Sequence, residues 1–277
     1  IIAVLVTEPL SELFSDPTYS EFLSGITEEL SESSYLPVIL QASSTHERNR
    51  AREHFERRSF DAVIDVSPYK GSELLEVLCE LGVPTVLCGQ LEGHPYRDVF
   101  STVYSDDEEG GRFAALAMKE RGRKDIVAVL GPQDNPAVVD RLRGYRAVLG
   151  EDLPDANVIY TGWNNGDGYQ AMHQILAREI AFDGVLCGSD RIAAGVITAL
   201  NEAGLSVPAD ISVVGFDDHE IATRCVPALT TVRQPLREEG HMAANIALDM
   251  IKGAEPTTSV MPVSYTHLRA HETLSDL

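Results

Sequence analysis

The feature that most constrains this chain is a repeated alternation of short apolar runs with segments of helical length. Runs of strand length occur at residues 1–6, 36–40, 61–66 and 84–88, and again at 126–130, 156–160, 183–187 and 211–215. Short continuous apolar runs are consistent with strands buried on both faces, and strands that alternate with helices form parallel sheets with right-handed crossovers. The sequence therefore predicts an α/β chain with two doubly wound parallel-sheet lobes.

The segments between these runs carry helix signals. Asp16 followed by Pro17 is a typical helix start, and Phe22, Ile26 and Leu30 then recur at helical spacing. A stripe of leucines within residues 74–81 ends at Gly82, as helices often do. Further helices are expected at residues 47–58, 137–149, 166–179, 192–204 and 235–253.

Residues 211–235 (ISVVGFDDHEIATRCVPALTTVRQP) combine a strand, a polar turn and a second extended segment. Gly215 is expected to end the strand, which places Asp217 and Asp218 at its carboxyl end. Open α/β sheets bind their ligands at that edge. The second extended segment should end near Pro235, which lacks the N–H that a sheet ladder needs.

Composition excludes several classes of protein. The chain has 277 residues, which suits two lobes, and its formal charge of −21 argues against direct binding of these residues to nucleic-acid phosphates. Since no apolar run approaches the roughly 20 residues needed to span a bilayer, we expect no membrane segment. The four cysteines lie in or beside apolar segments without C-x-x-C spacing, which favours reduced thiols and the cytoplasm. The chain begins directly with a strand, so we expect an upstream piece to be missing from this sequence.

Motifs for catalysis or cofactor binding are not found. The sequence has no G-x-S-x-G elbow, no P-loop, and no G-x-G-x-x-G after Val6. His267 and His271 are spaced as a helical metal pair, but no third ligand is near them. We therefore expect no catalytic residue, no cofactor and no metal site.

The turn Gly215-Phe216-Asp217-Asp218 and the segment PALTTVRQ at residues 227–234 resemble the signature of the lactose-repressor (LacI/GalR) family of bacterial transcription regulators. The resemblance covers about residues 1–263. It implies a periplasmic-binding-protein-like type I fold with three crossovers between the lobes, near residues 101–104, 230–234 and 260–263. The first lobe would comprise residues 1–102, completed by about 234–260, and the second 103–233, completed by about 261–265. Residues 264–277 match nothing in the family pattern, and we expect this tail to be foreign to the fold.

Candidate ligand contacts follow from the strand ends and from the resemblance. Asp217 would accept hydrogen bonds from a ligand, Arg141 would donate them through its forked guanidinium, and Trp163 would stack on a sugar or purine. The alternatives are a helix cap for Asp217, an ordinary ion pair for Arg141 and a loop position without ligand for Trp163. The remaining candidates are Ser189, Asp190, Tyr19, Thr18 and Asp106. Ser189 or Asp190 is also expected to start the following helix, Asp218 is expected to be structural, and Asp107 is an alternative to Asp106.

The resemblance implies an effector-sensing domain that forms a homodimer and that contacts operator DNA only through an amino-terminal headpiece absent here. The dimer surface would include the helix at residues 74–81 and its second-lobe counterpart. A small sugar is the expected effector, with a purine or nucleoside second and a protein partner also open. The alternative function is an exported sugar-binding protein of an ABC-type transporter. An enzymatic function has no supporting constellation.

Overall fold

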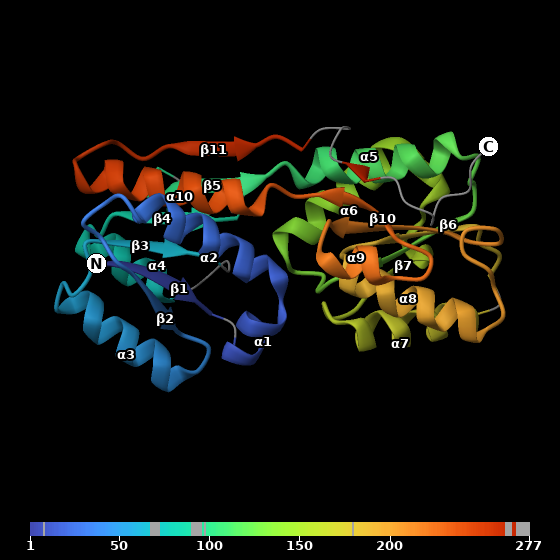
Figure 1. Cartoon of the computed structure of the whole chain (residues 1–277), viewed down its shortest axis with the longest axis horizontal. Helices are drawn as coiled ribbons and strands as arrows, with labels where there is room; N and C mark the ends of the chain where they lie inside the picture. The colour runs from blue at the N-terminus through green and yellow to red at the C-terminus, as the bar shows by residue number, and fades with distance from the viewer. Residues whose placement is uncertain are drawn as a thin grey trace. The chain divides into compact units, whose positions relative to one another are not determined.

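Each of the two units of this chain is built around one six-stranded sheet in the computed structural model (Figure 1). The structure describes residues 1–7, 9–66, 73–89, 96, 98–178, 180–263 and 268–269. Unit 1 contains Ile1–Ser105 and Pro235–Met261, and unit 2 contains Asp106–Gln234 and the described residues from Pro262 onward. The chain therefore passes from one unit to the other three times.

The sheet of unit 1 has the strand order β11-β5-β4-β3-β1-β2, and all of its described pairings are parallel. Its strands are β1 (Ile2–Val6), β2 (Pro37–Gln41), β3 (Ala62–Asp65), β4 (Thr85–Cys88), β5 (Ser101–Ser105) and β11 (Thr258–Met261). The chain starts at an inner strand, β1, and adds β2 on one side and the other strands on the other side, as in a doubly wound fold.

The sheet of unit 2 has the order β12-β10-β9-β8-β6-β7. Its strands are β6 (Ile126–Leu130), β7 (Val158–Tyr160), β8 (Gly184–Cys187), β9 (Ser212–Asp217), β10 (Thr230–Arg233) and β12 (Leu268–Arg269). The described pairings are parallel except that β12 runs antiparallel to β10. The backbone of β12 lies within the stretch that the sequence predicts to be a foreign tail, and the origin of that stretch stays a prediction.

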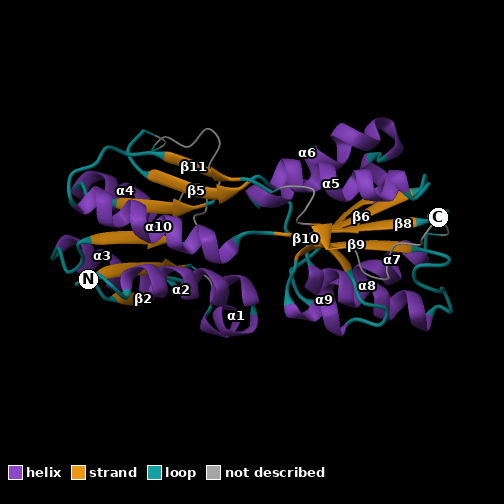
Figure 2. Ribbon diagram, turned by 45° about the horizontal axis from the view of Figure 1, so that its top comes forward, coloured by secondary structure: helices purple, strands orange, loops and turns teal. Residues whose placement is uncertain are grey.

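Both faces of each sheet are covered by helices (Figure 2). In unit 1, α2 (Pro17–Leu30) and α10 (Leu236–Ile251) pack on one face, and α3 (Thr45–Glu56) and α4 (Glu73–Leu81) pack on the other. In unit 2, α5 (Asp107–Glu120) and α6 (Pro136–Leu149) lie opposite α7 (Asn165–Leu176) and α8 (Asp190–Glu202). The short helices are α1 (Leu10–Ser15), α9 (Glu220–Arg224), η1 (Gly150–Asp152) and η2 (Asp155–Asn157).

Alternation along the strands explains this layering. In β1, Ile2, Val4 and Val6 point into the core under α2 and α10, whereas Ala3 and Leu5 point into the core under α3 and α4. Since successive side chains of a strand point to opposite faces, a strand covered on both sides must be apolar throughout. The continuous apolar runs in the sequence meet this requirement.

Local capping chemistry sets where several helices begin. The Asp16 carboxylate accepts a hydrogen bond from the backbone N–H of Thr18 at 3.0 Å, and Pro17 is the first residue of α2. Ser44 and Glu47 form a reciprocal capping box at the start of α3. These helix starts are therefore encoded within a few residues of sequence.

Glycine lets the paired helices approach closely. A β-carbon on Gly144 of α6 would lie 2.0 Å from the carbonyl oxygen of Glu108 in α5, and one on Gly25 of α2 would lie 2.0 Å from the carbonyl oxygen of Arg237 in α10. Both positions exclude any side chain, because the neighbouring atom is rigid backbone. These glycines allow backbone-to-backbone packing on the sheets.

The predicted fold class is confirmed, with two differences in detail. Residues 101–104, expected as a crossover, belong to strand β5 inside the unit 1 sheet, and the crossing follows Ser105. Gly215 does not end β9, which continues to Asp217, because pairing with β10 extends to Arg233. Helices α1 and α5 were not predicted. Among the helices of the described residues, none is long and apolar enough to cross a membrane.

Candidate functional site

A strained turn begins at Asp217, the last residue of β9 in the unit 2 sheet. Asp217 and Asp218 have positive φ angles of 109° and 62°, a conformation uncommon for residues other than glycine. The turn is tied to β10 by hydrogen bonds from the backbone N–H of Gln234 to the Asp217 carbonyl and from the backbone N–H of Asp218 to Thr231 Oγ1. Such strain clusters at ligand sites, where the surrounding structure holds it in place. The turn is therefore a candidate functional element.

Arg141 on α6 lies between two carboxylates. Its Nε donates to Asp107 Oδ1 at 2.7 Å, and its Nη1 lies 3.6 Å from Asp217 Oδ1. The same Nη1 donates to the backbone carbonyl of Gly188, which follows β8. Gln234 Nε2 donates to Asp217 Oδ1 at 2.6 Å. The ends of β8 and β9 and the start of α5 thus converge on the Arg141 guanidinium, and Gln234 after β10 holds the Asp217 carboxylate.

Two aromatic rings complete this cluster. The guanidinium carbon of Arg141 lies 3.8 Å from the centroid of the Phe216 ring and 5.9 Å from that of the Trp163 ring. Both distances are within the range of cation–π attraction. Trp163 also lies against Gly131, where a β-carbon would come within 2.5 Å of the indole. Glycine at the end of β6 therefore leaves room for the indole ring beside the arginine.

The charges of the cluster stabilise one another. Burial alone would lower the pKa of Arg141, but the carboxylates of Asp107 and Asp217 outweigh burial and raise it. Burial raises the pKa of Asp107, although Arg141 opposes that shift. Arg141 therefore remains cationic at neutral pH, and it is the principal group that favours the ionised form of Asp107.

Ser189 and Asp190 are held in structural contacts. The Ser189 hydroxyl accepts the backbone N–H of Ile192 and caps α8, as expected for one member of this pair. Asp190 is fully buried and accepts from the hydroxyl of Thr231 at 2.5 Å and from the backbone N–H of His219 at 2.8 Å. Burial and the nearby Asp217 carboxylate raise the pKa of Asp190 well above its ordinary value. Asp190 thus joins α8 to the strained turn and to β10.

The other predicted residues have the following positions. Asp106 caps α5 by accepting the backbone N–H of Glu109 at 3.0 Å, whereas its neighbour Asp107 holds Arg141. Thr18 and Tyr19 belong to the first turn of α2 in unit 1, and Tyr19 packs partly against the core of that unit. A role in ligand binding for these residues stays a prediction.

Sequence reasoning missed Gln234 and Phe216, and it left Asp107 open as an alternative to Asp106. Gln234 directly follows β10, so the rule that selected Asp217 could also have selected it. Asp107 follows the helix cap, and the direction of its side chain depends on where α6 packs. Phe216 could have been placed only with the knowledge that β9 continues past Gly215.

This arrangement can bind a polar ligand that carries hydroxyl groups. The carboxylate of Asp217 accepts hydrogen bonds, Arg141 and Gln234 donate them, and Trp163 offers an apolar ring. Among the residues that the structure describes, no group of three or more His, Cys, Asp or Glu side chains is arranged to hold a metal ion. The pair His267 and His271 lies outside the described residues.

Sequence comparisons match this chain to one family model and to several regulators of transcription. A family model described as a periplasmic binding protein-like domain matches residues 115–270. The HTH-type transcriptional regulator CelR of Thermobifida fusca is 34% identical over 274 residues, covering 98% of this chain and 80% of that protein. The ribose operon repressor of Escherichia coli (strain K12) is 29% identical over 247 residues, covering 88% of this chain and 74% of that protein.

Solved structures agree with the sequence comparison. A structure described as a transcriptional regulator CelR–cellobiose complex has a TM-score of 0.93 and 32% identity, covering 98% of this chain and 84% of that one. A LacI family transcriptional regulator from Enterococcus faecium with bound ribose has a TM-score of 0.83 and 26% identity, covering 100% of this chain and 99% of that one. The chain therefore belongs to the LacI/GalR family of transcriptional regulators and corresponds to its effector-binding domain.

Proposed function

We propose that this chain senses a small sugar and that the polar cluster around Arg141 and Asp217 supplies the main contacts to it. The observation that supports this most is the convergence of a donor, an acceptor and two aromatic rings at the carboxyl end of the unit 2 sheet. In doubly wound sheets this edge is the usual place for a ligand.

The chemistry favours a sugar over other small molecules. A sugar hydroxyl both donates and accepts, so it can bond to Asp217 and to Arg141 at the same time. The C–H face of a pyranose can pack on the Trp163 indole. Two structural relatives were solved with cellobiose and with ribose. We propose cellobiose as the first ligand to test, with a purine as the second class.

The wider function follows the family and is likewise a proposal. Binding of the effector would change how the regulator binds its operator, through a DNA-binding segment outside these 277 residues. Two copies would associate as a homodimer in the cytoplasm, which agrees with four free cysteines. Since the relatives are regulators, we propose neither catalysis nor a cofactor. A transporter function has no support from these relatives.

Individual residues have distinct proposed roles. Asp217, Arg141, Trp163 and Gln234 would contact the ligand, and Asp107 would orient Arg141. Asp190 would hold the strained turn, and Ser189 would cap α8. Thr18, Tyr19 and Asp106 are proposed as further contacts.

Isothermal titration of the purified chain with cellobiose, ribose and hypoxanthine tests this function. We expect binding of a sugar, and a thermal shift that corresponds to about 2.7 kcal/mol at 100 times the dissociation constant. Asp217→Asn should weaken binding roughly tenfold to a hundredfold, because it removes a charged hydrogen-bond acceptor. Asparagine tolerates positive φ, so the turn should persist.

Asp155→Asn is the matched control, because Asp155 is an exposed carboxylate of the same unit. Equal loss of affinity in both variants would contradict the proposed site. If the chain binds hypoxanthine but neither sugar, the effector is a purine and not a sugar. If the folded chain binds none of the three compounds, its effector is another metabolite or a protein.

A further inference from the structure

A buried serine and a buried glutamate are joined in unit 1 at the point where the chain leaves that unit. The Ser105 hydroxyl donates a hydrogen bond to the Glu239 carboxylate, and each residue is 3% exposed. Ser105 is the last residue of β5, and Glu239 lies in the first turn of α10. Because burial of a carboxylate is costly unless hydrogen bonds hold it, this contact helps to fix where both segments lie.

The burial of Glu239 is not explained by the needs of its helix. Acidic side chains in the first turn of a helix interact favourably with its dipole, and Glu238 does so from an exposed position. Val103 lies in the core under α2 and α10, and Ser105, two residues later in the same strand, points to the same face. Burial raises the pKa of the Cys88 thiol in this core, and the Glu239 carboxylate raises it further. Glu239 therefore lies among the side chains at the carboxyl ends of β4 and β5.

All three crossings between the units involve this serine–glutamate pair. Unit 1 ends at Ser105, begins again at Pro235 and ends again at Met261. Met261 is the partner of Ser105 in the parallel register of β11 and β5. The backbone N–H of Glu239 donates to the Pro235 carbonyl at 2.9 Å. The Ser105–Glu239 hydrogen bond therefore joins the unit 1 ends of the three crossings.

Two of these crossings lead directly to the polar cluster of unit 2. Asp107, which accepts from the arginine of the cluster at 2.7 Å, is two residues after Ser105. Gln234, which donates to Asp217 Oδ1 at 2.6 Å, is five residues before Glu239. Since such short stretches leave the backbone little freedom, a shift at the joined ends would move both side chains.

We propose that the hydrogen bond between Ser105 and Glu239 positions Asp107 and Gln234, and that it thereby sets the affinity of the site for its sugar. Ser105 and Glu239 are positioning residues, because both are buried in unit 1 and neither would contact the ligand. This assignment depends on the proposed function for the location of the sugar site, and it adds that two residues outside unit 2 control that site.

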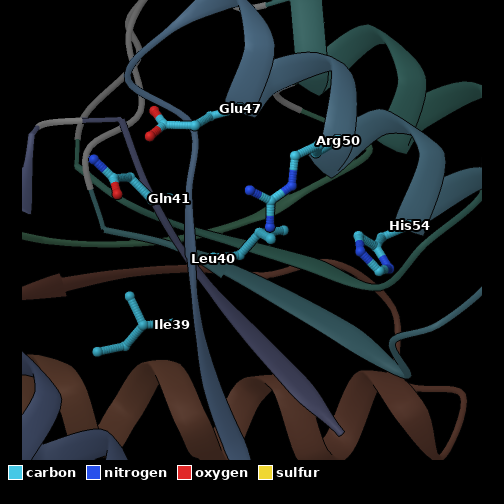
Figure 3. A pocket seen from close by; sticks show the side chains of 6 residues that line it. All are labelled: Ile39, Leu40, Gln41, Glu47, Arg50 and His54. Atoms are coloured by element: carbon cyan, nitrogen blue, oxygen red, sulfur yellow. The ribbon is translucent and has the colours of Figure 1, made fainter.

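A second serine–glutamate pair of unit 1 provides the matched control. The Ser43 hydroxyl donates to the Glu47 carboxylate at 2.7 Å. Figure 3 shows Glu47 on α3, beside a groove whose lining also includes Arg50 and His54. The groove lies next to β2, at the opposite end of the sheet order from β5 and β11. Ser43→Ala should therefore leave the polar cluster of unit 2 unchanged.

The fluorescence of Trp163 tests the proposal without any ligand. Trp163 is the only tryptophan, and the guanidinium carbon of Arg141 lies 5.9 Å from its ring centroid. If Asp107 no longer holds the guanidinium in place, the indole loses a neighbour and becomes more accessible. Acrylamide should therefore quench the fluorescence of Ser105→Ala more strongly than that of the wild type, and Ser43→Ala should match the wild type.

Titration of the whole chain with cellobiose measures the consequence for binding. Ser105→Ala should raise the dissociation constant about tenfold, as is usual for coupling between separate sites. Glu239→Gln should lose less affinity than Glu239→Leu, because its amide oxygen still accepts the Ser105 hydroxyl. In the Glu239→Leu background, Ser105→Ala should change the dissociation constant less than about twofold, because the two residues act as one unit. Circular dichroism checks that each variant is folded.

The possible outcomes separate this proposal from the proposed function. Unchanged quenching of Trp163 in Ser105→Ala would overturn the proposal, as would unchanged cellobiose affinity or an equal loss of affinity in Ser43→Ala. Additive losses in Ser105→Ala and Glu239→Leu would also overturn it, because the two residues would then act separately. If the wild-type chain binds no cellobiose, the proposed sugar is wrong, and the quenching measurement alone decides whether the hydrogen bond positions the cluster.

Discussion

Replacement of Arg141 by methionine tests whether the buried ionic cluster holds unit 2 together. The Arg141 side chain is 5% exposed, and those of Asp107 and Asp217 are 13% and 7% exposed. At an effective dielectric constant of about 20, opposite charges about 4 Å apart attract by about 4 kcal/mol. Methionine keeps an apolar contact with Phe216 but leaves two buried carboxylates without their cation. We expect the free energy of unfolding to fall by about 3–5 kcal/mol.

Urea unfolding followed by Trp163 fluorescence measures this loss, because Trp163 is the only tryptophan and belongs to unit 2. Arg146→Met is the matched control on the same helix. Its side chain is 38% exposed and pairs with Asp155, which is 95% exposed. A surface pair of this kind should contribute less than about 1 kcal/mol. Addition of Asp107→Asn to Arg141→Met should recover part of the loss, because it removes one unpaired charge.

The loss should also depend on pH. Burial already raises the pKa of Asp107, and removal of Arg141 removes the main opposing influence. A carboxyl with a raised folded-state pKa contributes stability that is present below its unfolded pKa of about 3.9 and is lost as pH rises through the folded pKa. The deficit of Arg141→Met should therefore be smaller at pH 5 than at pH 8. Losses within about 1 kcal/mol of each other for Arg141→Met and Arg146→Met, or a deficit unaffected by pH, would refute this reasoning.

Three further predictions concern single positions. Because burial raises the pKa of Asp190, ionisation of this carboxyl destabilises the fold as pH rises. Between pH 4.5 and pH 8, the melting temperature of Asp190→Asn measured by calorimetry should therefore fall less than that of the wild type. An equal dependence of melting temperature on pH in both proteins would contradict this. Gly144→Ala should lower the free energy of unfolding in urea by roughly 1–3 kcal/mol, although alanine has the better helix propensity, because its β-carbon would lie 2.0 Å from the Glu108 carbonyl oxygen. A stabilised variant would disprove that contact. Trp163→Leu should weaken sugar binding roughly tenfold in titration calorimetry, and unchanged affinity would remove the indole from the site.

Much of the candidate site could be named from sequence because it follows the strand ends. Asp217, Arg141 and Trp163 were each expected near a ligand, and the structure brings these three side chains together. The choice between Asp106 and Asp107 could not be made from sequence, since one caps a helix and the other reaches a residue 34 positions away.

The sequence alone determined the features that depend on residues close together in the chain. Apolar runs require strands buried on both faces, and Asp16-Pro17 and the Ser44–Glu47 capping box start helices within a single turn. Only the tertiary structure decided which distant residues contact the same charged group, as Gln234 and Arg141 both do at the Asp217 carboxylate. It also decided that β2 lies at an open edge. Both depend on long-range packing, in which atoms far apart in sequence compete for the same space, and no local pattern records the outcome.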